Sequence, residues 1–276
     1  MGKLPISIEF FPPKDASGID HLLENVTNKF SKLNPEYFSV TYGAGGSTRD
    51  GTEQTIEKLI KAGYGASPHL SMGLDDEAQL RAQLDRYRTL GVTRIVALRG
   101  DQPSGSGNSK FTNNAEALVN LVRDHSGNHF DLVVAAYPEV HPDAENAVQD
   151  MDFFANKVAA GANHAITQYF YNADAYEHFL EQCAQRNISI PIVPGIMPIT
   201  GFASLVRFSE RCGAEIPRWL KYKLASVAEE DVPKLGLDVV TRLCEKLITI
   251  GAPAMHFYCL NRWGQTTRIC ENLHLA

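Results

Sequence analysis

A regular alternation is the feature that most limits the folds open to this chain. Short apolar runs recur along its 276 residues, and each is followed by a segment whose apolar residues have helical spacing. The run 95–98 contains no polar residue, which is typical of a parallel strand buried on both faces. In the segment 75–90, Leu80, Leu84 and Tyr87 repeat at the spacing of one helical face. The chain therefore reads as strands and helices in turn.

This alternation predicts eight strand–helix units. Strands are expected at 5–11, 36–41, 66–70, 95–98, 132–137, 164–168, 192–193 and 255–258. Helices are expected at 16–33, 51–62, 75–90, 113–124, 143–160 and 173–186, with two or three more between 202 and 250 and one after strand eight. Such a chain is of the α/β class and predicts a single (β/α)8 TIM barrel over residues 1–276, with extra helices between strands 7 and 8. A doubly wound open sheet is the alternative, but polar residues end most of the strands rather than one switch point.

Composition excludes several classes of protein. The net charge of −6 and the lack of a Lys/Arg-rich block argue against a nucleic-acid-binding surface. No apolar run approaches the roughly 20 residues of a membrane span, and the N-terminus lacks a signal-peptide pattern. Five dispersed cysteines without a Cys-x-x-Cys spacing indicate reduced thiols. These features predict a cytoplasmic protein that binds neither nucleic acid nor membranes.

Polar residues follow the predicted strands, where a parallel α/β fold binds its ligands. The fourth strand ends in Arg99-Gly100-Asp101, followed by a loop rich in Pro, Ser and Gly. A cation and a carboxylate thus lie beside backbone that can approach a ligand closely. The alternative is an ordinary strand-to-helix loop with a surface Arg and Asp.

Glu9 lies in the first strand between Ile8 and Phe10. An apolar environment disfavours the ionised form, so these neighbours predict a raised pKa that suits a general acid. The alternative is that the Glu9 carboxylate finds a salt-bridge partner.

Two further strand ends remain ambiguous from local sequence. The Gly-rich segment 43–48 has Thr48 where a dinucleotide-binding motif needs its third Gly, so it is either a tight turn or a loop that approaches a ligand. His69 ends the third strand and is either a hydrogen-bonded structural residue or a ligand contact. A metal site formed by His69, Glu139 and His141 lacks any supporting spacing, and no metal is expected.

The later strand ends carry five more candidates for binding. Asp150 and Lys157, after strand five, suit a sugar or diphosphate, or a solvated helix face. Gln168, after strand six, offers the paired donor and acceptor that a pteridine edge requires. Phe208 is either a core residue or a stacking residue, and Arg262 places a cation after strand eight.

Eight separated motifs, in order along essentially the whole chain, carry a resemblance to a known family. They are Glu9-Phe10-Phe11-Pro12-Pro13, Val40-Thr41-Tyr42-Gly43-Ala44, Ala97-Leu98-Arg99-Gly100-Asp101, Ala136-Tyr137-Pro138-Glu139, Gly161-Ala162-Asn163, Ile166-Thr167-Gln168, Pro194-Gly195-Ile196 and Phe257-Tyr258-x-Leu260-Asn261-Arg262. The chain resembles bacterial 5,10-methylenetetrahydrofolate reductase in its catalytic-domain-only form, without the C-terminal regulatory domain of eukaryotic relatives.

The resemblance implies an FAD-dependent TIM barrel with FAD at the carboxyl ends of the strands. Such an enzyme takes hydride from NADH, or NADPH, and reduces 5,10-methylenetetrahydrofolate to 5-methyltetrahydrofolate in a ping-pong reaction. This oxidoreductase acts in one-carbon metabolism and supplies the methyl group for methionine biosynthesis. The sequence does not decide between NADH and NADPH, or the polyglutamate length of the folate. A homo-oligomer is expected.

The resemblance also assigns roles to individual residues. Glu9 is the general acid that opens the imidazolidine ring of the folate, and Asp101 tunes hydride transfer and holds the pterin. Gln168, Phe208 and Arg262 bind substrate. The implied FAD contacts are Thr41, Tyr42, Ala44, His69, Arg99, Gly100, Asp101, Ala115, Tyr137, His141, Ala144, Asp150 and Lys157.

Some positions depart from the family pattern. Phe153 and Asn156 align where relatives often have Asn and a basic residue facing FAD, which leaves the FAD affinity open. Ser204 aligns with a folate-contacting Gln, and the loop between Gly107 and Ala115 is about two residues longer than in some relatives.

Three other functions are compatible with parts of the pattern. They are a folate-binding methyl-transfer barrel without flavin, a structural barrel without catalysis, and a flavin-independent reductase that Phe153 and Asn156 suggest. The first two give no reason for the acidic pair Glu9 and Asp101.

Overall fold

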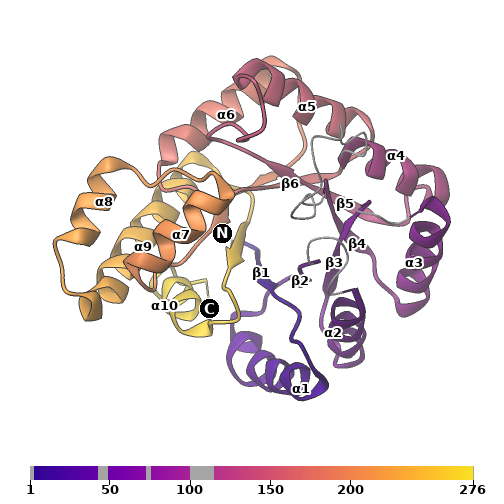
Figure 1. Cartoon of the computed structure of the whole chain (residues 1–276), viewed down its shortest axis with the longest axis horizontal. Coiled ribbons are helices and arrows are strands. Elements are labelled where there is room, and N and C mark those ends of the chain that lie inside the picture. Colours follow the sequence, from indigo (N-terminus) through magenta and orange to yellow (C-terminus); the bar gives the residue numbers. More distant parts are fainter. Residues whose placement is uncertain (1–2, 43–48, 73–75, 100–114, 276) are drawn as a thin grey trace.

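A ring of parallel strands surrounded by helices forms the centre of the molecule (Figure 1). The computed structural model describes residues 3–42, 49–72, 76–99 and 115–275. Its strands are β1 (Ile6–Phe10), β2 (Tyr37–Val40), β3 (Ala66–Ser71), β4 (Arg94–Leu98), β5 (Asp131–Ala136), β6 (His164–Thr167), β7 (Ile192–Val193), β8 (Gly195–Ile196) and β9 (Met255–Tyr258). They pair in the order β7-β6-β5-β4-β3-β2-β1-β9-β8, and only Pro194 separates β7 from β8. The predicted TIM barrel is confirmed.

The seventh barrel strand differs from its prediction because it is broken into β7 and β8. Val193 pairs with β6, whereas Gly195 pairs with β9. Pro194 has no N–H to donate, but its carbonyl accepts from the His256 N–H at 3.1 Å. A Cβ on Gly195 would lie 2.2 Å from the Thr167 carbonyl oxygen, so glycine is required at this close approach. The seventh strand therefore changes its pairing partner from β6 to β9 at Pro194.

Successive residues of each strand face alternately the helices and the barrel interior. Ile6, Ile8 and Phe10 of β1 join the large core between sheet and helices, so Ser7 and Glu9 face the interior. On β4 to β7 the interior carries a small apolar cluster, formed by Val96, Val133, Ile166 and Val193. On β1, β3 and β9 the same alternation turns polar residues inward, namely Ser7, Glu9, Ser67, His69, Ser71, His256 and Tyr258. One half of the interior is apolar and the other half is polar.

The helices follow the predicted order and pack around the strands (Figure 1). They are α1 (Ala16–Asn25), α2 (Arg49–Lys61), α3 (Glu77–Leu90), α4 (Ala115–Ser126), α5 (Ala147–Ala159), α6 (Ala173–Gln185), α7 (Phe202–Cys212), α8 (Arg218–Ala225), α9 (Val232–Ile250) and α10 (Trp263–Asn272). The predicted extra helices are confirmed as α7, α8 and α9, which gather on one side of the barrel in orange tones.

Two predicted helices differ most from their expected bounds. The helix expected at 16–33 is regular only to Asn25 and continues as a π-helical turn, Val26–Phe30, and a 3-10 turn, Ser31–Leu33. The helix expected from 143 begins at Ala147, because Asn146 is extended and its side chain accepts the Gln149 N–H as an N-cap.

A group of mostly charged residues lies at the amino-terminal end of the barrel. We call this group the base cluster: Glu36, Tyr37, Arg94, Asp131 and His164. Arg94 Nε donates to Asp131 Oδ2 at 2.7 Å, and His164 Nδ1 lies 2.9 Å from Asp131 Oδ1. The Arg94 guanidinium also bonds Glu36 at 3.1 Å and lies 4.3 Å from the centre of the Tyr37 ring. These contacts join β2, β4, β5 and β6 at the end of the barrel remote from the carboxyl ends of the strands.

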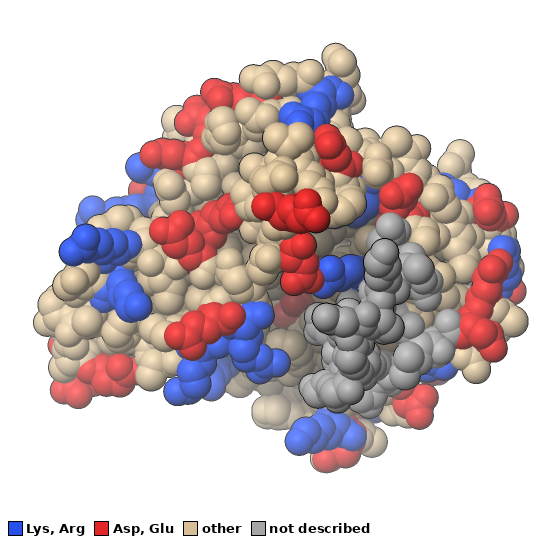
Figure 2. Space-filling view, turned by 45° about the horizontal axis from the view of Figure 1, so that its top comes forward, with Lys and Arg blue, Asp and Glu red and all other residues tan. Residues whose placement is uncertain are grey.

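The outer surface is a mixture of charges. Figure 2 shows acidic and basic side chains interspersed over one face rather than gathered into a patch of one sign. None of the helices in the described ranges is both long and apolar enough to cross a membrane.

Candidate active site

Glu9, two histidines and a serine form a compact group inside the polar half of the barrel. We call this group the mouth cluster: Ser7, Glu9, His69 and His256. Glu9 Oε2 lies 3.3 Å from His256 Nε2, a hydrogen bond, and 3.2 Å from His69 Nε2. The His69 contact has ion-pair distance without hydrogen-bond alignment. His256 is completely buried, and its other ring nitrogen lies 2.7 Å from Ser7 Oγ. One carboxylate oxygen thus meets two imidazoles.

The pKa of Glu9 moves opposite to the sequence prediction. Burial alone raises this pKa, but the charge of His69 and the hydrogen bond from His256 outweigh it and lower the pKa to about 2. The prediction of a raised pKa was wrong because Ile8 and Phe10 point outward, whereas Glu9 points inward toward the histidines. The alternative, that Glu9 finds a partner for its charge, describes the structure.

His256 and Ser7 are the residues that sequence reasoning missed. The signal was the alternation in β9: Met255 and Phe257 face the outer core, so His256 must face the interior. His69 was noted as either a structural residue or a ligand contact. Its Nε2 lies 3.2 Å from Glu9 Oε2 on the mouth side of β3, and its contact with FAD stays a prediction.

A second group of predicted residues gathers after β4 and β5. Arg99 Nη2 donates to Asp143 Oδ2 at 2.5 Å, and the Asp143 N–H donates to His141 Nδ1 at 3.0 Å. The Tyr137 and His141 rings meet edge to face with centroids 4.4 Å apart. The His141 N–H donates to Asp150 Oδ2 at 3.0 Å, which ties this loop to the first turn of α5. Ala144 joins the same loop through its N–H bond to the His141 carbonyl, at 3.0 Å.

Lys157 of α5 points toward the end of β5, where its ammonium donates to the Ala135 carbonyl at 2.6 Å. Burial lowers its pKa to about 8, Asp150 opposes this shift, and Arg99 adds to it. A desolvated cation held by a carbonyl oxygen, with Arg99 nearby, suits an anionic ligand such as a diphosphate. Of the two readings of Lys157, the solvated helix face is wrong, since this side chain is turned inward.

The predicted substrate-binding residues lie on three separate elements. Gln168 follows β6, and its Oε1 accepts the Tyr169 N–H at 3.0 Å. Phe208 of α7 is partly buried against the core, with its ring 6.1 Å from that of Tyr169. Arg262 is exposed at the start of α10, and its Nη1 donates to Thr200 Oγ1 at 3.3 Å.

The remaining predicted residues lie before α2 and at the start of α4, or outside the described ranges. The Thr41 carbonyl accepts from Thr52 Oγ1 at 2.8 Å, and Tyr42 Oη accepts from Arg49 Nε at 3.1 Å. Ala115 is the first residue of α4. Ala44, Gly100 and Asp101 fall outside the residues that the structure describes.

The metal site considered from the sequence, with His69, Glu139 and His141 as ligands, does not form among the described residues. Glu139 Oε2 accepts the Glu215 N–H at 2.9 Å, whereas His69 contacts Glu9. Within the described ranges, no group of three or more His, Cys, Asp or Glu side chains is arranged to hold a metal ion.

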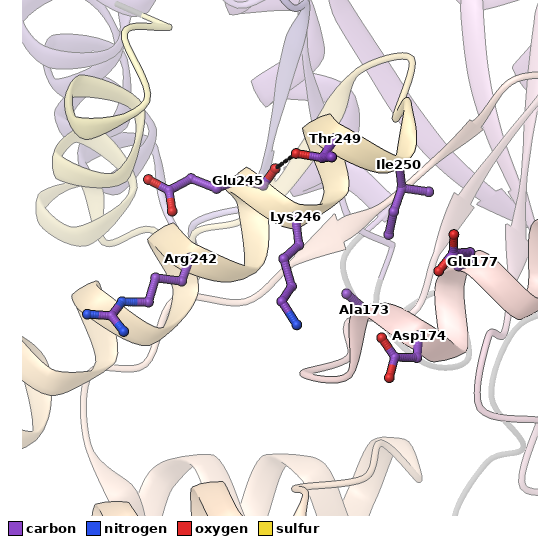
Figure 3. Close-up of a pocket in the computed structure, with 8 residues that line it drawn as sticks. All are labelled: Ala173, Asp174, Glu177, Arg242, Glu245, Lys246, Thr249 and Ile250. Carbon is purple, nitrogen blue, oxygen red and sulfur yellow. Dashed lines mark hydrogen bonds between the residues drawn. The ribbon is translucent and has the colours of Figure 1, made fainter.

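A shallow groove of about 470 Å³ lies elsewhere, in the helical layer between α6 and α9 (Figure 3). Acidic and basic side chains both line it, among them Glu177, Arg242 and Lys246. Arg242 already pairs with Asp238 at 3.1 Å, and none of the predicted site residues lines the groove. The candidate active site is therefore the mouth of the barrel.

Comparison with known proteins shows the family of the chain. Residues 1–274 match the family described as methylenetetrahydrofolate reductase. The chain belongs to this family. It is 36% identical over 275 residues to the 5,10-methylenetetrahydrofolate reductases of Salmonella typhimurium and Escherichia coli, covering 99% of this chain and 91% of each relative. It is also 33% identical to methylenetetrahydrofolate reductase (NADH) 1 of Arabidopsis thaliana, covering 99% of this chain and 49% of the plant protein.

Solved structures confirm the fold. An uncharacterized protein from Clostridium thermocellum, described as binding two copies of 5-methyl-5,6,7,8-tetrahydrofolic acid, superposes with a TM-score of 0.67 at 18% identity, covering 97% of this chain and 93% of that one. A 2,3-dimethylmalate lyase superposes with a TM-score of 0.53 at 7% identity. The family membership predicted from the eight motifs is confirmed, and it supports methylenetetrahydrofolate reductase activity.

Proposed function

We propose that this protein catalyses the flavin-dependent reduction of 5,10-methylenetetrahydrofolate to 5-methyltetrahydrofolate with NADH or NADPH, by a ping-pong mechanism. The observation that carries the proposal is the mouth cluster, in which Glu9 meets His69 and His256 inside the barrel of a chain from this reductase family. The product supplies methyl groups for methionine biosynthesis.

The residues after β4 and β5 fit FAD. Lys157 is a partly buried cation suited to the diphosphate, Arg99 lies close enough to lower its pKa, and Tyr137 and His141 form an aromatic surface beside them. Bound FAD supplies the hydride-transfer chemistry of the family. Thr41, Tyr42, Ala115, Ala144 and Asp150 complete the proposed contacts among the described residues, with Ala44, Gly100 and Asp101 outside them.

Glu9 is proposed to move the proton that opens the imidazolidine ring of the folate. With its pKa lowered to about 2, the carboxyl group alone is ionised near neutral pH. An imidazole nitrogen can accept or donate a proton, and two imidazoles lie within 3.3 Å of one Glu9 oxygen. The proton is therefore held by the mouth cluster as a unit and reaches the substrate nitrogen through Glu9. Protonation breaks the carbon–nitrogen bond and leaves a 5-iminium cation, which accepts hydride.

Folate binding is assigned to Gln168, Phe208 and Arg262. Gln168 offers an amide to the pterin edge, Phe208 offers a ring face beside Tyr169, and Arg262 offers an exposed guanidinium at the rim. Asp101 is proposed to hold the pterin and to oppose negative charge on the reduced flavin. Phe153, at 52% exposure on α5, offers no polar group toward FAD in place of the family's Asn.

An absorbance spectrum of the purified protein, followed by assays with both substrates, tests this proposal. Bands at about 380 and 450 nm are expected from the flavin, together with NADH oxidation by menadione and production of 5-methyltetrahydrofolate. Folate reduction by a colourless protein would favour the flavin-independent reductase. Methyl transfer without NADH oxidation would favour the methyl-transfer barrel.

We further propose that residues 1–276 act as one catalytic domain, in the cytoplasm and as a homo-oligomer. The five cysteines are free thiols, which suits a reducing compartment. Trp219 and Tyr222, more than half exposed on α8, support self-association.

A further inference from the structure

The turn after β9 holds the end of β1 by side-chain contacts. Backbone pairing between the two strands ends at Glu9 and Tyr258. Beyond this pair, the Asn261 side chain meets the backbone of Phe11 on both sides: Oδ1 accepts the Phe11 N–H at 2.9 Å, and Nδ2 donates to the Phe11 carbonyl at 3.0 Å. Cys259 Sγ adds a bond to the Glu9 carbonyl at 3.1 Å. We call the two Asn261–Phe11 bonds the amide clamp.

The backbone of this turn explains why a side chain is needed here. Leu260 and Asn261 both have left-handed conformations, with φ values of 51° and 58°. Two such residues in succession turn the chain away from β1, so the backbone can no longer continue the ladder of hydrogen bonds. Asparagine tolerates left-handed backbone better than most residues, and its amide carries one donor and one acceptor group, as a peptide does. The Asn261 amide thus replaces the next backbone partner of Phe11.

The clamp joins the two strand ends that carry the proposed acid and the proposed folate-binding cation. Glu9 precedes Phe11 by two residues, and Arg262 directly follows Asn261. We propose that Asn261 is a positioning residue for the folate reaction, which fixes Glu9 and Arg262 relative to one another across the rim. This inference rests on the proposed function and adds a residue to it.

Two substitutions separate the amide from the backbone conformation. Asn261→Gly keeps a backbone that is comfortable at positive φ but removes both bonds. Asn261→Asp keeps the acceptor for the Phe11 N–H but turns a second acceptor toward the Phe11 carbonyl. Asn187, which is exposed in the turn between α6 and β7, also has a left-handed backbone, with φ of 57°. Asn187→Asp is therefore the matched control.

The experiment measures the folate reaction and NADH oxidation by menadione separately, as kcat and KM. For both Asn261 variants we expect kcat/KM for folate to fall about 100-fold, the cost of a displacement of about 1 Å, with kcat reduced and KM for folate raised. NADH–menadione oxidation should stay within about twofold of wild type, as should both reactions of Asn187→Asp. Wild-type folate kinetics in Asn261→Gly would overturn the proposal, and so would an equal loss in both reactions.

Hydrogen exchange gives a second readout that needs no activity. The Phe11 amide should exchange faster in Asn261→Gly than in wild type, and unchanged exchange would contradict the clamp. Should an aspartate at 261 prevent folding, Asn261→Ser serves in its place, because one hydroxyl cannot span both Phe11 groups. A wild-type protein that fails to reduce folate would refute the proposed function, whereas the exchange measurement would still decide whether the clamp exists.

Discussion

At each of its two ends the barrel holds a carboxylate between two basic side chains, and the two ends differ in one of these side chains. In the base cluster, Asp131 meets Arg94 and His164 at 2.7 and 2.9 Å. In the mouth cluster, Glu9 meets His69 and His256 at 3.2 and 3.3 Å. Burial opposes ionisation of both carboxylates, yet their partners lower both pKa values. The base has a guanidinium, and the mouth has only imidazoles.

This difference distinguishes Asp131, whose role we expect to be structural, from Glu9, whose proposed role is catalytic. A guanidinium remains charged at every pH that a protein meets, so Asp131 keeps its partner throughout. An imidazole nitrogen can either accept or donate a proton, so the two rings around Glu9 have a chemistry that a guanidinium lacks. The same barrel thus holds a fixed ion pair where the strands begin and groups able to pass a proton where they end.

The largest expected effect is on catalysis at the mouth. Glu9→Gln keeps the shape of the side chain but cannot transfer a proton, so folate turnover should fall about 10³-fold. Flavin content and NADH–menadione oxidation should remain, because neither needs this proton. Stopped-flow measurement of each half-reaction checks the prediction. Folate turnover near the wild-type rate would remove Glu9 from its role.

The corresponding change at the base should act on stability alone. Asp131→Asn leaves Arg94 without its close carboxylate partner and should lower the free energy of unfolding by about 2 kcal/mol. Because no residue of the base cluster is proposed to contact substrate, kcat and KM should not change. Urea unfolding and steady-state kinetics on the same sample provide the measurement. Altered kinetics in the folded protein would mean that the two ends are coupled.

A smaller effect is expected when the mouth cluster loses one imidazole. His256→Asn retains a group that can hydrogen-bond but removes a proton carrier, so folate turnover should fall about tenfold. Its dependence on pH between 5 and 8 should also become flatter. The matched change at the base, His164→Asn, should leave the pH profile of turnover as it is. If both variants change that profile equally, the contrast between mouth and base is wrong.

The last effect is confined to acid pH. The folded-state pKa of Glu9 is lowered from 4.5 to about 2, so its ion pairs contribute stability that is present above pH 4.5 and lost as pH falls toward 2. Glu9→Gln should therefore make the loss of unfolding free energy across this window smaller, by about 2 kcal/mol. Thermal or urea unfolding between pH 5 and 2.5 measures it. An unchanged slope would show that Glu9 is not ionised in the folded state.

Local sequence patterns predicted the barrel but not the environment of its acid. The order of strands and helices follows from hydrophobic periodicity, which is a local pattern, so it could be predicted from the sequence. The partners of Glu9 lie 60 and 247 residues farther along the chain, and no local window connects them. A register argument over β1 and β9 predicts that Glu9 and His256 both face inward, but which pair touches depends on barrel closure. The π-helical turn Val26–Phe30 has no sequence signal that we recognise.

The split of the seventh strand at Pro194 has a consequence for how the barrel comes apart. Around the rest of the wall, one continuous strand bonds both of its neighbours, whereas here two dipeptides each bond only one. Side-chain bonds span the split: Thr167 Oγ1 of β6 accepts the Gly195 N–H at 2.9 Å, and Tyr258 Oη of β9 donates to the Thr167 carbonyl at 2.8 Å. Because β7 and β8 are one continuous stretch of chain, the cylinder can open here only by giving up either the β6–β7 or the β8–β9 pairing, each two residues long.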